Sequence, residues 1–508
     1  MPKAVGWPRW WLAGLPFVYV LSPLAILGNL YLRQLPAAAR LLLLIYAASQ
    51  LLPALVAPDA AMATLLALGR TVFVTGLVGI GAQWGSTREV RWLGLGLGLT
   101  YALALGFSLL EGTDLWRQRL AHPYMTSVSL GLAGSAGLWL AAYAPGLRGW
   151  RWPLSLLALT ILLLSGSRGA LLAALLGLLA GALLKRWRAA TALFVVAALG
   201  LLAFGLGGGQ TNVAALDRLR TTDGSGRDVV WSNTLSVVQA YPWTGAGPYQ
   251  LGRSITVPGE GCELFPSAQG DVTASCPAWL ERLRNPWIIA HNGSLHQLAE
   301  SGPLGLGGWA LLFGTAMVVA VQRRDALGAA VLVGLTVANL NDNTTLVPSP
   351  FFAEVFWIVA GVQLRHLTAL RFSHGAVSAL LLAGLSWPVL SAAWPIPAER
   401  VNQDFGLAFL YAPTNASPES DYAVLARFAV PPGTYRASLN ACTATCALLE
   451  TRTFTVLPDQ PAPTVRLVGR LWPDSRQRLE LRLLSGQAGQ GGRLGELARH
   501  TWFVEGTP

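Results

Sequence analysis

The sequence predicts an all-α polytopic membrane protein with a large loop on its outer face and a smaller β-rich domain at its C-terminus. Of the 508 residues, 53% are hydrophobic and only 12% are charged, whereas soluble domains carry roughly a quarter charged residues. The 20 tryptophans and 55 glycines agree with this class, because tryptophan favours the headgroup level and glycine is frequent in spanning helices. Alternation of apolar and polar residues near the C-terminus predicts the β-rich part.

The apolar runs predict the helices. The first run covers 10–32, which is too long for the hydrophobic core of a signal peptide, so we interpret it as an uncleaved helix. Further runs cover 37–57, 60–84, 92–110, 124–144, 153–167, 168–184 and 189–207, and then 293–321, 325–346, 351–371 and 374–394. Because a span needs ~20 residues, these runs predict about twelve transmembrane helices.

Positively charged loops predict the orientation, since such loops stay in the cytoplasm. The clearest are Lys185-Arg186-Trp187-Arg188 and Arg323-Arg324. The domains that follow are 1–207 with about eight helices, 208–292 as an extracytoplasmic catalytic loop, 293–394 with about four helices, and 395–508 as an extracytoplasmic β domain. The same alternation places the N-terminus outside, against Lys3 and Arg9. A short hairpin broken at Pro16 and Pro23 would resolve this conflict.

Residues 396–508 have a different pattern. Runs at 422–430, 453–457, 464–468 and 478–484 alternate with period two, and turns rich in Pro, Gly and Asp separate them. This pattern predicts a small β-sandwich-like domain. It contains no catalytic motif, so we expect a binding or spacer role.

Charge and cysteine content narrow the function classes. The net charge of +11 fits cytoplasmic loops and attraction to anionic lipids. Nucleic-acid binding is disfavoured, because the arginines are dispersed among apolar runs. The cysteines form two pairs in polar segments, Cys262 with Cys276 and Cys442 with Cys446, which favours disulfides in an oxidising compartment. Zinc is the alternative, but no four-ligand spacing is present.

A polar corner precedes the run that begins near residue 293. Ser294-Leu295-His296-Gln297 fits an S-x-x-Q capping box and predicts a helix start near Ser294. His291 then lies at the mouth of that helix, where it could bind anions and exchange protons. A satisfied capping or packing histidine is the simpler interpretation. His296 and Glu300 are spaced i,i+4 and could share a metal, but no third ligand is evident, so we predict no metal site.

Arginines on the expected outer face are the other candidates. Arg168 interrupts the apolar stretch 156–184, and a guanidinium at that depth normally faces a cavity or a partner; a turn reaching the headgroups is the alternative. Arg227 and Trp231 begin an amphipathic segment that also fits a plain interfacial helix. The Gly245/Gly247 pair after it follows a helix and is not a dinucleotide fingerprint.

Together, these motifs resemble the O-antigen ligase and polymerase superfamily of membrane glycosyltransferases. The resemblance covers about residues 155–365 and is carried by motifs in a fixed order. They are Ser167-Arg168-Gly169-Ala170-Leu171-Leu172, Arg227 with Trp231, Pro242 with Gly245 and Gly247, His291-Asn292 with Glu300-Ser301-Gly302-Pro303-Leu304-Gly305, and Asn339-Leu340-Asn341-Asp342. The final span and the β domain depart from the minimal family pattern, which leaves the acceptor open.

The resemblance implies a GT-C-like fold in the bacterial inner membrane and inverting, metal-independent, cofactor-free transfer of a preassembled glycan from undecaprenyl diphosphate. The acceptor would be lipid A core, a growing glycan or a protein hydroxyl. His291 would be the general base, with Arg168 and Arg227 on the diphosphate. Weaker substrate-binding candidates are Arg218, Arg220, Arg253, Arg284, Asn292 and Trp231. Ligase, polymerase and protein O-oligosaccharyltransferase remain open.

Two functions from other classes rank lower. A transporter or flippase for lipid-linked glycans would fit the intramembrane arginine, but such proteins often contain internal repeats, and we find no convincing repeat here. A sensor anchored by its helices would not need about twelve spans.

Overall fold

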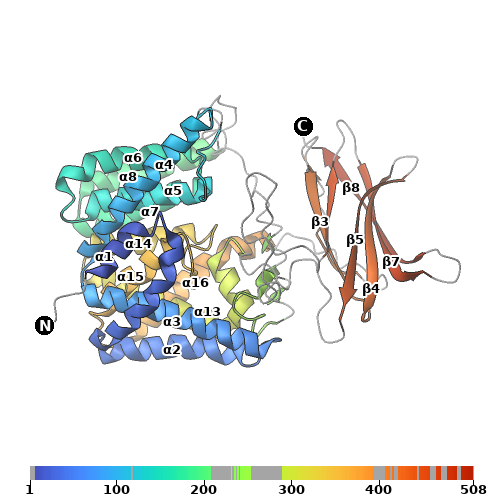
Figure 1. Cartoon of the computed structure of the whole chain (residues 1–508), viewed down its shortest axis with the longest axis horizontal. Helices are drawn as coiled ribbons and strands as arrows, with labels where there is room; N and C mark the ends of the chain where they lie inside the picture. The colour runs from blue at the N-terminus through green and yellow to red at the C-terminus, as the bar shows by residue number, and fades with distance from the viewer. Residues whose placement is uncertain are drawn as a thin grey trace. The chain divides into compact units, whose positions relative to one another are not determined.

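The computed structural model describes residues 6–115, 118–206, 230–231, 234–235, 237–238, 241–252, 289–393, 407–411, 415–416, 421–442, 446–457, 465–470, 477–488 and 494–506. The chain forms two compact units. The first contains Met1–Arg227, Trp243–Gly247 and Ile289–Pro388 and is helical. The second contains Asp228–Pro242, Pro248–Ile288 and Val389–Pro508 and includes the β-strands (Figure 1).

The first apolar run is not the single helix that the sequence analysis expected. It divides into α1 (Trp7–Gly14) and a 3₁₀ segment, η1 (Tyr19–Gln34). Pro16 lies between the two segments and explains the division, because it offers no backbone N–H to continue an α-helical ladder. Pro23, the other break that the hairpin interpretation invoked, lies inside η1.

The other helices follow the predicted apolar runs closely. They are α2 (Ala37–Ala54), α3 (Ala60–Trp84), η2 (Thr87–Trp92), α4 (Leu93–Leu110), α5 (Ser127–Tyr143), η3 (Arg148–Trp150), α6 (Arg151–Leu164), α7 (Arg168–Lys185), α8 (Arg188–Leu206), α13 (Gly293–Gln322), α14 (Ala326–Ala338), α15 (Phe352–Leu364) and α16 (Phe372–Ala393).

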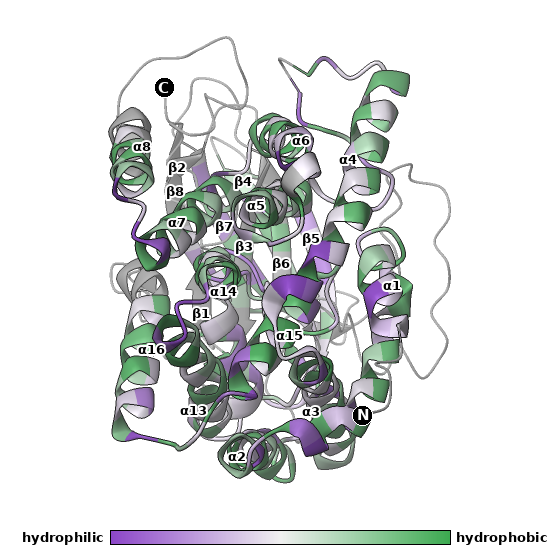
Figure 2. Ribbon diagram, turned by 90° about the vertical axis from the view of Figure 1, so that its left-hand side faces the viewer, coloured by the Kyte–Doolittle hydropathy of each residue, from purple (hydrophilic) through white to green (hydrophobic). Residues whose placement is uncertain are grey.

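Hydrophobic residues cover most of these helices (Figure 2). Within the described part of the chain, five helical segments are long and apolar enough to cross a membrane. They are Ala37–Ala54, Ala60–Trp84, Thr87–Leu110, Arg168–Lys185 and Gly293–Gln322. The chain is thus a mostly helical membrane protein, and the expected count of twelve spans stays a prediction.

Small residues let the helices approach closely around Trp139 of α5. Its indole nitrogen donates to the Ala174 carbonyl on α7 at 3.2 Å. A Cβ at Gly177 of α7 or at Gly334 of α14 would lie within 2.4 Å or 2.1 Å of the indole ring. Glycine at these positions is therefore required for the α5–α7–α14 packing.

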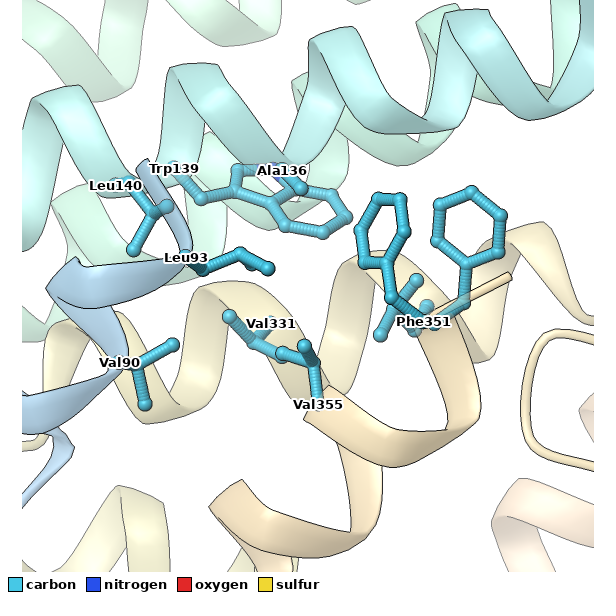
Figure 3. Close-up of a pocket in the computed structure, with 10 residues that line it drawn as sticks. Val90, Leu93, Ala136, Trp139, Leu140, Val331, Phe351 and Val355 are labelled. Carbon is cyan, nitrogen blue, oxygen red and sulfur yellow. The ribbon is translucent and has the colours of Figure 1, made fainter. Parts of the chain in front are cut away.

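A small apolar cavity lies beside Trp139 (Figure 3). Its lining includes Leu140, Val331 and Val355, and its volume is about 10 Å³, room for about one water molecule. Because its walls are apolar, we interpret it as a packing gap rather than a substrate site.

The β-strands of the second unit form two sheets, of order β1-β3-β6 and β2-β8-β7-β4-β5. Pairing is antiparallel except between β2 and β8. One hydrophobic cluster includes residues from both sheets, such as Val424 and Leu467 from the first and Leu439 and Leu481 from the second. The sandwich arrangement itself stays a prediction. The strands are β1 (Leu407–Tyr411), β2 (Asn415–Ala416), β3 (Asp421–Phe428), β4 (Gly433–Cys442), β5 (Cys446–Val456), β6 (Val465–Arg470), β7 (Gln477–Ala488) and β8 (Leu494–Gly506).

A disulfide joins Cys442 at the end of β4 to Cys446 at the start of β5. These two cysteines are opposite each other in the strand register, so the bond closes the β4–β5 hairpin. Cys262 and Cys276, the other predicted pair, lie outside the described residues.

Candidate active site

The N-cap of the helix that carries the polar corner lies two residues earlier than the capping-box pattern suggested. Asn292, not Ser294, caps α13, because the Asn292 side chain accepts the Leu295 N–H at 2.9 Å. Asparagine is at least as strong an N-cap as serine. Gln297, expected to complete a capping box, instead donates to the Gln50 side chain on α2 at 2.7 Å.

The Asn292 amide also ties α13 to the turn after α14. Its Nδ2 donates to the Leu340 carbonyl at 3.0 Å, and the Gly293 N–H donates to the Asn339 carbonyl at 2.9 Å. A Cβ at Gly293 would lie 1.9 Å from the Asn339 side chain. Glycine at position 293 therefore lets the start of α13 contact the 339–342 turn directly.

His291 lies at this junction with a strained backbone and a partly exposed ring. Its φ is +49°, a left-handed value that non-glycine residues rarely adopt. Its Nδ1 lies 3.7 Å from Asp342 Oδ1, and 40% of its side chain is exposed. Asp342 belongs to the 339–342 motif, whose sequence alone indicates no role for it; in the structure it lies beside the candidate base.

Arg168 is the first residue of α7, and this end of α7 lies beside the 339–342 turn. Its N-cap, Ser167, makes no side-chain capping bond, and a Cβ at Gly169 would lie 3.9 Å from Asn341 Cβ. The residues at the start of α7 thus contact the 339–342 turn on which the start of α13 also packs. Since a helix N-terminus presents backbone N–H groups, the start of α7, which has no side-chain cap, offers a setting suited to an anion.

Arg119, which the sequence analysis did not single out, also lies at this helix start. Its guanidinium donates to the Gly166 carbonyl at 3.1 Å and to the Ser127 hydroxyl at 2.9 Å. The segment around Arg119 is polar and lacks a recognisable motif, so its proximity to Arg168 is visible only in the fold.

The Glu300-Ser-Gly-Pro motif forms a break inside α13. Gly302 adopts φ +63° within the helix, and Pro303 has no N–H to donate back to Ala299. The carbonyls of Ala299 and Glu300 instead accept the N–H groups of Ala246 at 2.8 Å and Gly247 at 3.0 Å. The 243–247 turn therefore binds to the carbonyls that the break in α13 exposes. This contact explains why the Gly245/Gly247 motif and the Glu300-Ser-Gly-Pro motif occur in the same chain.

Behind the corner, three buried polar side chains contact one another. Arg70 of α3 donates to Glu300 Oε2, and His296 Nε2 lies 3.1 Å from Glu300 Oε1. The His296 Nδ1 accepts the Ala290 N–H at 3.2 Å. The i,i+4 spacing of His296 and Glu300 is apparent in the sequence, whereas their connection to Arg70 appears only in the structure.

The remaining predicted site residues are only partly visible. Trp231 is half-buried in the helical pair 230–231. Outside the described residues lie Arg218, Arg220, Arg227, Arg253 and Arg284. Of the predicted catalytic trio, the structure places Arg168 and His291 around one turn and does not describe Arg227.

The arrangement combines an anion-binding end with a proton acceptor. The Arg168 guanidinium and the N-terminal end of α7 suit a phosphate-like group. His291 beside Asp342 suits proton transfer, because a carboxylate orients an imidazole and stabilises its charged form. Such a pair of functions is what transfer from an activated phosphate ester to a hydroxyl requires.

Comparison with protein families agrees with the motif resemblance. Residues 153–310 match the family model described as O-Antigen ligase. This match covers Arg168, His291 and the break in α13. No curated protein and no solved structure matches the chain.

Proposed function

We propose, from the premise that the chain belongs to the O-antigen ligase superfamily, that it transfers a preassembled glycan from undecaprenyl diphosphate to an acceptor hydroxyl with inversion. One observation carries the proposal: the Arg168 helix start and the His291–Asp342 pair contact the same 339–342 turn. The region around this turn would therefore supply both an anion-binding site and a general base for one reaction.

The proposed step balances as a direct displacement. His291 takes the proton of the acceptor hydroxyl, and the acceptor oxygen attacks the anomeric carbon. The bond from that carbon to the phosphate oxygen breaks, and undecaprenyl diphosphate leaves with the electron pair. Arg168, the α7 N–H groups and, from the outer loop, Arg227 stabilise the charge that develops on the diphosphate. These cations make the proposed reaction independent of a metal.

The proposed setting is the bacterial inner membrane, with about twelve spans and the 208–292 loop on the extracytoplasmic side. The weaker cation candidates, Arg218, Arg220, Arg253 and Arg284, would extend the diphosphate site within that loop. Asn292 and Trp231 would contribute to substrate binding. The C-terminal domain, proposed as a β-sandwich on the same side, would bind or space the acceptor.

The test uses purified full-length protein in detergent with a lipid-diphosphate-linked glycan and candidate acceptors. We expect His291→Ala to lower the transfer rate by about 10²–10⁴-fold, the range of general-base catalysis. Asp342→Asn should lower kcat by a smaller factor with little change in KM, because it orients the base without contacting donor or acceptor. His366→Ala, which changes an exposed histidine bonded to the Gly85 carbonyl, is the matched control.

The products also separate the alternatives. Lipid A core joined to glycan indicates a ligase, longer glycan chains indicate a polymerase, and a modified protein indicates the third branch. A wild-type protein that forms no glycosidic bond with any acceptor contradicts the proposal and favours transport. Near-normal transfer by His291→Ala would also contradict it.

A further inference from the structure

A chain of buried hydrogen bonds runs from α3 to the residue just before His291. It contains Arg70, Glu300 and His296, and it ends at the Ala290 N–H. We propose that this chain, the positioning relay, holds His291 in its reactive orientation although none of its members touches substrate. The inference rests on the proposed function, since it assumes that His291 is the base.

The hydrogen bonds define the state of the His296 ring. Its Nδ1 accepts the Ala290 N–H at 3.2 Å, so that nitrogen carries no hydrogen. The remaining nitrogen, Nε2, must carry the hydrogen that it donates to Glu300 Oε1 over 3.1 Å. These two hydrogen bonds hold the imidazole in one orientation, with Nδ1 toward Ala290 and Nε2 toward Glu300.

The ion pair fixes the other end of the relay. The side chains of Arg70 and Glu300 are 2% and 0% exposed, so each charge depends on the other for its stability at this depth. A guanidinium does not lose its proton in proteins, and Arg70 therefore keeps Glu300 ionised and accepting. The carboxylate in turn fixes the His296 ring through Oε1.

What the relay holds is a backbone under strain. His291 has φ +49°, and a left-handed conformation costs an L-residue energy that persists only where neighbours enforce it. The Ala290 N–H is fixed on one side by His296, and Asn292 is fixed on the other by Leu295 and Leu340. His291 is thus held between two clamps, one of which is the relay.

Two conservative variants separate this role from simple packing of α3 against α13. His296→Asn places a side-chain oxygen near the former Nδ1, so it keeps an acceptor for Ala290 but loses the donor to Glu300. His296→Gln places an amide nitrogen near the former Nε2, so it keeps the donor but loses the acceptor. Only the relay model predicts that the two variants differ in the behaviour of His291.

We expect His296→Gln to lower kcat for glycan transfer by up to about 10²-fold, the effect of a ~1 Å misplacement of a catalytic group. His296→Asn should retain a much larger fraction of kcat. Donor KM should stay unchanged in both. Equal losses of kcat that follow equal losses of thermal stability would overturn the proposal, as would wild-type kcat in His296→Gln.

A second measurement does not depend on transfer. The rate at which diethyl pyrocarbonate modifies His291, followed by mass spectrometry, should change most in His296→Gln and by less in His296→Asn, which loses the bond to Glu300 but keeps an acceptor for the Ala290 N–H. If the wild-type protein makes no glycosidic bond, the proposed function fails while this rate still tests the relay. If transfer occurs but both variants modify His291 at the wild-type rate, the relay alone fails.

Arg70→Lys provides a further variant should His296→Gln not fold. Lysine keeps the positive charge but lacks the planar guanidinium geometry, so Glu300 should shift and kcat should fall with donor KM unchanged. Unchanged kcat in Arg70→Lys would overturn the proposal.

Discussion

Each of the two units contains a buried carboxylate held by arginine, and the two sites differ in the hydration of the cation. Glu300 and Glu480 are 1% and 3% exposed. Glu300 is paired with Arg70, which is itself 2% exposed. Glu480 Oε1 is instead within 2.7 Å of Arg482 and 2.9 Å of Arg499, whose side chains are 30% and 49% exposed.

The difference shows how solvent decides what an ion pair does. Around Glu300 both charges are removed from water, so the pair is stable only in the geometry that the helices impose. Around Glu480 the guanidiniums remain hydrated and the pair tolerates movement. The first arrangement therefore suits fixing a site, whereas the second suits a domain surface.

The largest expected effect compares the two carboxylates directly. Glu300→Gln removes the carboxylate charge that is paired with the buried guanidinium of Arg70, and we expect it to lower the free energy of unfolding by about 3–5 kcal/mol. Glu480→Gln should cost about 1 kcal/mol or less, because Arg482 and Arg499 can turn to water. Calorimetry of the detergent-solubilised chain measures both.

The paired replacement sharpens that test. Arg70→Met combined with Glu300→Met removes both charges and should recover much of the stability that Glu300→Gln loses, while transfer stays impaired because the relay is absent. Similar stabilities for Glu300→Gln and Glu480→Gln would show that the hydration of the arginines is not what separates the two sites.

The second-largest expected effect comes from the backbone break next to Glu300. The Glu300 carbonyl accepts the Gly247 N–H and so holds the 243–247 turn against α13. Gly302→Ala would place a Cβ 2.1 Å from the Trp243 carbonyl oxygen at φ +63°, and the left-handed conformation alone costs about 1–2 kcal/mol. We expect a lower unfolding midpoint and slower transfer.

Gly307→Ala is the matched control on the same helix. A Cβ there meets nothing within 4 Å, so alanine should be neutral or stabilising by up to about 1 kcal/mol. Equal effects of the two substitutions would show that the break in α13 is not the feature that matters.

Sequence reasoning selected candidate site residues in the helical unit but not the buried contacts behind them. Short motifs indicated Arg168 and His291 and their order, because those residues stand out against apolar surroundings. The Arg70–Glu300 contact joins residues 230 positions apart, and no local pattern in a single sequence specifies such a pairing. Asp342 was visible as part of a motif, but its place beside His291 depends on the packing of α13 against the turn after α14.

Local sequence patterns gave the wrong helix boundaries in two places, where the same residues fitted two structures. The run 10–32 has the composition of a span, yet it divides at Pro16 into α1 and the 3₁₀ segment η1. Ser294 and Gln297 fit a capping box, yet the Asn292 side chain bonds the Leu295 N–H and Gln297 is taken by Gln50. In both cases the competing residues were present in the sequence, and backbone hydrogen bonding decided between them.

The smallest expected effect on stability is electrostatic. It comes from the partly exposed arginines around Glu480, one of which, Arg499, also pairs with Glu496. The hydrogen bond from Arg499 holds the pKa of the Glu496 carboxyl below its usual value. A carboxyl whose pKa is lowered by folding stabilises the fold above its unfolded pKa of about 4.5, and this stability is lost as the pH falls through the folded pKa. Because Glu496 is partly exposed, we expect about 0.5 kcal/mol or less.

Glu496→Gln isolates this contribution, since glutamine resembles the protonated acid. The wild type should have a slightly higher unfolding midpoint than Glu496→Gln at pH 7, and the difference should vanish below the folded pKa. It should also shrink in 1 M salt, where the Debye length falls to about 3 Å. A difference that persists below the folded pKa would show that the effect of Glu496→Gln does not come from the charge of the carboxylate. A difference that is lost in acid but unchanged in 1 M salt would show that this cluster is not screened by solvent, and the contrast between the two units would then not arise from hydration.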